Sequence, residues 1–130
     1  MEPADVRRLA LLALPLLGIA APASATGGFH CEATDGSNLA ISGTVGRVIG
    51  APLIGASLHL GDRTLSTTDE PPLIAIGRSW LDEREMRVDL VDANAERFEA
   101  QLRARPRGDG TATGTLVREG RTHRVRCELE

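Results

Sequence analysis

The sequence predicts an all-β protein, a single small antiparallel meander barrel of about eight strands. Three observations support this fold class. Apolar and polar residues alternate along most of the chain after residue 26, which is the pattern of half-buried antiparallel strands. Glycine is the first residue of several short connections, as is typical of two-residue hairpin turns. Two cysteines lie near the two ends of the same segment.

The first 25 residues have the order of a secretory signal peptide. Arg7 and Arg8 precede an apolar run, Leu9–Ala20, and the small residues Ala23-Ser24-Ala25 follow as a cleavage site. The run is shorter than the roughly 20 residues that a membrane-spanning helix needs. We therefore expect cleavage after residue 25, which leaves residues 26–130 as one all-β domain in the periplasm or outside a bacterial cell. The arginine pair leaves twin-arginine export open beside the general secretory route.

Six segments show the alternation clearly, and they cover residues 29–33, 39–45, 54–60, 86–90, 98–102 and 125–129. In each segment every second residue is apolar and is expected to face the barrel interior. On this parity Ile54 and Phe98 point inward. A further strand follows the break at Pro71-Pro72, and its Trp80 shares the parity of the apolar residues Ile74 and Ile76.

Three connections have glycine as the first residue of a two-residue loop, and they are Gly46-Arg47, Gly61-Asp62 and Gly120-Arg121. This is the signature of a type II′ hairpin turn. The second loop places Leu58 opposite Leu65, and the third places Leu116 opposite Val125. Apolar residues then face each other across both hairpins, an arrangement that a slip of one residue would destroy.

Cys31 and Cys127 are the only cysteines of the chain. An even count in an exported domain indicates a disulfide. In the chain-entropy model, a disulfide that closes a loop of this length stabilises the folded state by ~4.7 kcal/mol. A redox pair would instead need close spacing such as Cys-x-x-Cys. We expect a structural disulfide that joins the first and last strands from inside the barrel, with Gly114 opposite Cys127. The alternative fold is a β-sandwich.

The charge pattern argues against nucleic-acid binding. The chain has a formal net charge of −3 and contains two Phe, one Trp and no Tyr. Nucleic-acid binding uses a basic excess and, for single strands, aromatic stacking. On parity, Arg124 and Arg126 lie on the solvated outer face of the last strand, with Thr115 and Val117 as cross-strand neighbours.

No catalytic, cofactor-binding or metal-binding motif is found. His30 and His59 have outward parity on different strands and His123 begins the last strand, so neither a metal site nor an enzymatic activity is expected. Trp80 is the residue that stands out. It either plugs the barrel or, with its neighbour Arg78, anchors a partner.

The layout resembles the periplasmic inhibitors of c-type lysozyme. The shared features are a cleaved signal, a first strand with Phe29-His30-Cys31, a single domain of antiparallel strands and a cysteine near the end. That family implies a small barrel that inserts a loop with a Ser-Gly-x-x-Tyr motif into the enzyme cleft. This sequence has only Ser42-Gly43 and no Tyr, so no functional residue is carried over from the family.

These observations predict an exported, monomeric, non-catalytic β-barrel without a cofactor, which engages a protein or another component of the cell envelope. It would not span a membrane after cleavage of the signal. The alternative prediction is a periplasmic carrier of a small ligand or a metal.

Overall fold

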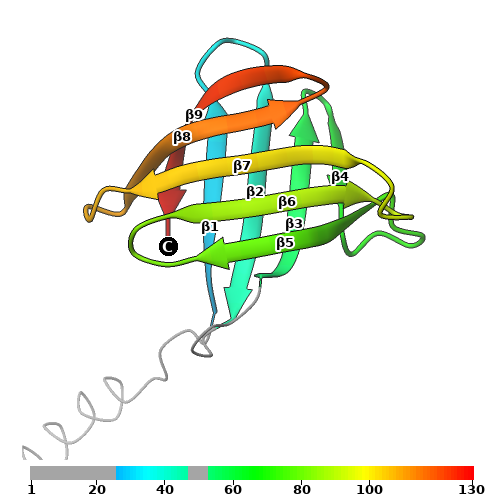
Figure 1. The fold of residues 1–130 in the computed structure, drawn as a ribbon, viewed down its shortest axis with the longest axis horizontal. Helices are drawn as coiled ribbons and strands as arrows, with labels where there is room; N and C mark the ends of the chain where they lie inside the picture. Colours follow the sequence, from blue (N-terminus) through cyan, green and yellow to red (C-terminus); the bar gives the residue numbers. More distant parts are fainter. Residues whose placement is uncertain (1–25, 47–52) are drawn as a thin grey trace, which may run out of the picture.

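The computed structural model describes residues 26–46 and 53–130, and these residues form nine β-strands (Figure 1). The strands are β1 Thr26–Ala33, β2 Leu39–Gly46, β3 Leu53–Leu60, β4 Arg63–Ser66, β5 Ile74–Leu81, β6 Met86–Asp92, β7 Phe98–Pro106, β8 Thr111–Arg118 and β9 Arg121–Leu129. The expected signal peptide lies outside the described residues. No helix long and apolar enough to cross a membrane occurs in the described part.

The nine strands form one antiparallel sheet in the order β4-β3-β2-β1-β9-β8-β7-β6-β5. β1 pairs with both β2 and β9, so the first and last strands lie side by side. The sheet curls until β5 contacts β3 and β4 at the opposite edge. Figure 1 shows β5–β8 as one wall, with β1–β3 crossing behind it. The predicted meander barrel is therefore confirmed, nearly closed and built from one continuous sheet, in place of a two-sheet sandwich.

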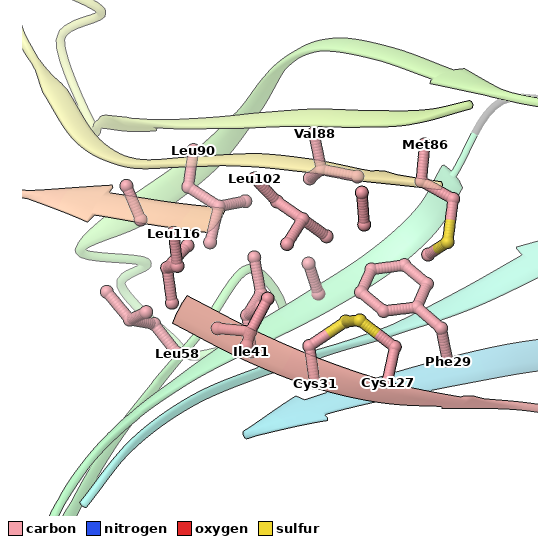
Figure 2. Packing of buried hydrophobic residues seen from close by; sticks show 14 of the residues in the cluster. Phe29, Cys31, Ile41, Leu58, Met86, Val88, Leu90, Leu102, Leu116 and Cys127 are labelled. Atoms are coloured by element: carbon pink, nitrogen blue, oxygen red, sulfur yellow. A yellow bond between two sulfur atoms is a disulfide. The ribbon is translucent and has the colours of Figure 1, made fainter. Parts of the chain in front are cut away.

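Aliphatic side chains fill the barrel (Figure 2). Ile41, Leu58 and Leu102 have no exposed surface, and they come from strands on opposite walls. Among the described residues, Phe29 is the one aromatic residue in this core. A small aliphatic core gives limited stability in a domain of this size, so a covalent cross-link supplies a large share of the total stability.

Cys31 and Cys127 form the predicted disulfide inside the barrel. They are direct register partners of β1 and β9, and their Cα atoms are 3.9 Å apart. The backbone N–H of Thr34 donates to the carbonyl oxygen of Arg124. Because bonded and non-bonded pairs alternate along an antiparallel ladder, the cysteines occupy a non-hydrogen-bonded pair, where facing side chains come closest.

The hairpin between β3 and β4 confirms the sequence prediction. Leu58 lies opposite Leu65, and Gly61 has a φ of 73°. A glycine at positive φ in the first loop position is the geometry of a type II′ turn.

The hairpin between β8 and β9 differs from the prediction by two residues. Leu116 pairs with His123 rather than Val125. The loop consists of Glu119 and Gly120, with φ angles of 51° and 76°, and two consecutive positive angles define a type I′ turn. A shift of two residues keeps every side chain on its expected face.

The same shift changes the cross-strand neighbours of four residues of β9. Cys127 lies opposite Ala112, and Gly114 lies opposite Val125. On the outer face, Arg124 pairs with Thr115 and Arg126 pairs with Thr113. The predicted neighbours were Val117 and Thr115, so this detail of the prediction is wrong while the outward orientation is right.

The predicted turn at Gly46-Arg47 falls partly outside the described residues. Val45 pairs with Leu53 rather than with Val48. A two-residue loop at this point is therefore wrong, because β2 and β3 are joined through residues 47–52.

Two β-bulges turn large apolar residues outward, against the sequence prediction. A register shift beside Val45 brings Leu53 into the core position and leaves Ile54 57% exposed. A second shift, beside Leu90, leaves Phe98 59% exposed. Each bulge adds one residue to one strand and so reverses the parity beyond it.

A third bulge, in β5, decides the position of Trp80. Gly77 and Arg78 interrupt the register between Ile76 and Ser79, which reverses the parity of the rest of the strand. Trp80 therefore points outward and is 59% exposed. It does not plug the barrel.

Candidate binding site

A cavity of about 1040 Å³ opens at one end of the barrel, and we call it the mouth. It lies between the start of β1, the end of β9 and the turns that join β5 to β6 and β7 to β8. Its volume is at the upper end of the range typical of small-ligand pockets.

The walls of the mouth are apolar. Phe29 and Met86 are almost fully buried at its base, and Val45, Leu81 and Leu129 are partly buried around them. Leu81 and Met86 are register partners of β5 and β6, while Phe29 and Leu129 are register partners of β1 and β9. The barrel register itself therefore brings these apolar side chains to one end.

Asp82 shapes the rim of the mouth at the turn between β5 and β6. Its Oδ1 accepts hydrogen bonds from the backbone N–H groups of Glu85 at 2.8 Å and Arg84 at 2.7 Å, and its Oδ2 accepts one from Trp80 Nε1 at 2.8 Å. These bonds, from Glu85, Trp80 and Arg84 in that order, lower the pKa of Asp82, because they favour the ionised carboxylate. The same bonds fix the turn and the indole edge of Trp80.

Two further carboxylates on the rim have no partner among the described residues. The exposed side chains of Glu83 and Glu130 make no hydrogen bond or ion pair with any described residue, and no basic side chain from residues 26–46 or 53–130 lines the mouth. The described part of the rim is therefore negatively charged above an apolar base, an arrangement that favours an occupant with a cationic head and an apolar body.

The two residues that the sequence indicated as partner-binding lie on β5 beside the mouth. Trp80 is the register partner of Arg87 and faces outward, tethered to the rim through Asp82. Arg78 is exposed in the bulge and forms no ion pair with a described residue. Both side chains leave β5 on its outer side, and neither enters the mouth.

Sequence reasoning missed the mouth residues themselves. The available signal was the meander: from β5 onward, every second turn of an up-and-down sheet lies at the same end of the barrel. That rule places the turn at Asp82-Glu83 and the turn at Gly108 together. The same rule brings the end of β9 there, and the predicted pairing of β9 with β1 adds Phe29. The rule does not show that these residues line a common cavity, because that depends on how far the sheet curls.

A second polar cluster lies on the outer side of β1–β3. The Nε2 and Nδ1 atoms of His59 lie 3.1 Å from Ser42 Oγ and 3.1 Å from Thr64 Oγ1. The ring centroids of His30 and His59 are 5.9 Å apart, and His30 Nε2 lies 2.9 Å from Glu32 Oε1. A hydroxyl, not a carboxylate, orients His59, so this Ser-His contact does not form the charge-stabilised triad of a hydrolase.

The three histidines are not brought together. His123 Nδ1 lies 2.7 Å from Asp35 Oδ2, on the turn between β1 and β2, away from the pair formed by His30 and His59. In the described segments, no group of three or more His, Cys, Asp or Glu side chains is arranged to hold a metal ion.

No protein-family model, curated protein or solved structure matches this chain. Its function is therefore inferred from the geometry of the mouth.

Proposed function

We propose that this protein is an exported, non-catalytic binding module that engages a protein partner through the mouth. One observation carries the proposal. A disulfide-closed barrel presents, at a single end, an apolar cavity, two rim carboxylates without a partner among the described residues, and a tethered, exposed tryptophan.

The chemistry of the mouth suits an arginine or lysine side chain of the partner. Such a side chain has an apolar stem and a charged head. The stem would lie against Phe29 and Met86, and the head would reach Glu83 or Glu130. Hydrogen bonds between a guanidinium or ammonium group and a carboxylate are stronger than neutral ones.

Trp80 would add an anchor beside the cavity. Tryptophan is enriched among the residues that dominate protein–protein affinity. The bond to Asp82 holds the indole in place before binding, so less side-chain freedom is lost when a partner packs on it. Arg78, two residues away on the same outer side, would lie at the edge of that contact.

Export is supported by the disulfide and by the sequence of residues 1–25. A structural disulfide persists in an oxidising compartment such as the periplasm or the cell exterior. The arginine pair, the apolar run and Ala23-Ser24-Ala25 supply the expected signal.

The resemblance to periplasmic inhibitors of c-type lysozyme suggests an enzyme as one class of partner. Ser42 and Gly43, the only match to the motif of that family, lie within β2. Ser42 contacts His59, and the ring of Phe29 leaves no room for a side chain at position 43. We therefore propose that a contact with such an enzyme would use the mouth.

A second candidate is a carrier of a small apolar amine. The volume of the mouth favours it, since cavities of this size hold small ligands. The same walls and rim would serve a free amine as well as a side chain, so the two candidates differ in what occupies the mouth. The metal version of this candidate would depend on His30 and His59.

Photo-cross-linking in cells that export the protein tests the proposal. A photoreactive amino acid at Arg84 or Arg107, exposed residues next to those that line the mouth, reports on the mouth, and one at Asn94, in the turn between β6 and β7, reports on the opposite end. We expect a discrete polypeptide adduct from the two mouth positions and none from Asn94. The substitution Glu130→Gln in the same proteins should weaken the adduct.

Two results would contradict the proposal. Adducts of equal strength from Arg84 and Asn94 would show contact without a preferred site. If no polypeptide adduct forms at the mouth and the purified protein carries a bound amine, the occupant of the mouth is a small ligand and not a protein.

A further inference from the structure

Four arginines form a two-by-two array on the outer face of β7–β9. Its two rows, each read from β7 through β8 to β9, are Arg103, Thr115 and Arg124, and Arg105, Thr113 and Arg126. Neighbouring strands lie about 4.8 Å apart and alternate residues about 6.8 Å apart, so the array measures roughly 10 Å by 7 Å along the backbone. We call these four residues the arginine array.

Two adjacent arginines on this face, Arg87 and Arg103, each contact a carboxylate. Arg87 and Arg103 are register partners on β6 and β7, and like charges in such a pair repel each other. Glu85 Oε2 lies 3.1 Å from Arg87 Nε, and Asp89 Oδ1 lies 2.9 Å from Arg103 Nη1. One corner of the array, Arg103, is therefore already compensated.

The other three arginines of the array are not compensated by a carboxylate of the described residues. Arg105, Arg124 and Arg126 are exposed and form no ion pair with any residue in the described part of the chain. Glu32 is the register partner of Arg126 on β1, but its carboxylate lies against His30 at 2.9 Å. Three guanidinium groups thus face solvent from one surface of a protein whose net charge is −3.

We infer that the arginine array docks the barrel onto an anionic phospholipid surface. Guanidinium groups bind phosphate through paired N–H donors, and the hydroxyls of Thr113 and Thr115 can donate between them. Clusters of basic residues are attracted to anionic headgroups over short distances. The array lies on the wall of the barrel and the mouth opens at its end, so both can be occupied at once.

The composition of the array favours a headgroup layer over a macromolecular partner. A protein interface is dominated by buried apolar or aromatic residues at its centre, whereas the centre of the array is Thr113 and Thr115. Single-stranded nucleic acid needs aromatic platforms, and no aromatic residue lies within the two rows. Headgroups require charge alone, which the array supplies.

Co-sedimentation with vesicles tests the inference. The protein, residues 26–130 with the disulfide intact, is mixed with vesicles of phosphatidylcholine alone or of phosphatidylcholine and phosphatidylglycerol in equal amounts. We expect binding only to the vesicles with phosphatidylglycerol, and release at high salt, because the attraction is screened. A net charge of −3 alone would repel the protein from these vesicles.

Two charge-matched variants locate the contact. Arg105→Gln, Arg124→Gln and Arg126→Gln together should weaken binding roughly a hundredfold, given the contribution of each basic residue near an anionic surface. Arg63→Gln, Arg84→Gln and Arg121→Gln together change the net charge equally, away from the array, and should bind like the wild type. Thr113→Glu, which keeps all arginines, should also weaken binding. Urea unfolding confirms that each variant is folded.

The inference is overturned by any of three results. The wild type could show no stronger binding to vesicles with phosphatidylglycerol than to vesicles without it. The two triple variants could lose binding equally. Poly-glutamate could bind more tightly than the vesicles, with the same dependence on Arg105, Arg124 and Arg126, which would identify an acidic protein as the occupant. None of these results bears on cross-linking at the mouth.

Discussion

Cys127 lies directly opposite Cys31 across β1 and β9, and their disulfide spans 96 positions of the sequence. The bond joins the last strand to the first, at the pairing that turns the meander into a barrel. Two residues further along the same strands, Phe29 faces Leu129 at the base of the mouth. The fastening of the barrel and the shape of its mouth thus depend on one strand pair.

Removal of the disulfide is the first test of this relationship. Cys31→Ala together with Cys127→Ala should lower the free energy of unfolding by about 2–5 kcal/mol, because the unfolded chain gains the freedom of a long open loop. Urea denaturation measures the change, and the reduced wild type should match the double variant. An unchanged midpoint would show that the bond adds nothing to the closed barrel.

The type I′ turn makes a second prediction. Glu119 has a φ of 51°, a region that costs most side chains roughly 1–2 kcal/mol and that asparagine tolerates better. Glu119→Asn should therefore raise the free energy of unfolding by roughly 0.5–1 kcal/mol. The exposed contact with Arg118 that is lost contributes little. No gain in thermal or urea stability would favour the loop at Gly120-Arg121 instead.

Asp35 predicts how stability changes in acid. Hydrogen bonds from the Ser37 side chain, from the ring of His123 and from the Ser37 backbone lower the pKa of Asp35 from 3.8 to about 2. Because the folded pKa is the lower one, the stabilisation is complete above the unfolded value and is lost as the pH falls from about 4 to about 2. Asp35→Asn should be less stable than the wild type near neutral pH.

The difference between Asp35→Asn and the wild type should disappear in strong acid. Thermal unfolding of both proteins across that pH range measures it. A difference that stays constant down to pH ~2 would mean that the turn does not depend on the ionised carboxylate.

The strands and their faces could be predicted from alternation, and the exact pairing could not. Leu116 is buried whether it faces Val125 or His123, because a shift of two residues preserves the face. The choice between the two registers depends on the backbone angles of Glu119, which no hydrophobic pattern reports.

The bulges mark a second limit of the pattern. Ile54, Phe98 and Trp80 were each expected on the core face, and each is exposed beyond or beside an extra residue. A bulge has no fixed sequence signature beyond small or flexible residues such as Gly77. One inserted residue then reverses all later positions of its strand.

The candidate site was only partly visible in the sequence. Trp80 stood out by its rarity, and its outward position fits the anchoring role that was one of two predictions. Glu83 and Glu130 did not stand out, because a charged residue in a turn or near the end of a strand is ordinary. The meander places both at the same end of the barrel, but their lining of one cavity depends on how far the sheet curls, which is a long-range property.

Native mass spectrometry of the protein, isolated gently from the compartment that receives it, tests whether the mouth holds a polypeptide. We expect a disulfide-bonded chain in a non-covalent complex with a second polypeptide. That complex should be lost in the variant with Glu83→Gln and Glu130→Gln, which leaves the apolar walls intact. A chain that carries a small molecule or a metal ion, and no polypeptide, would contradict it.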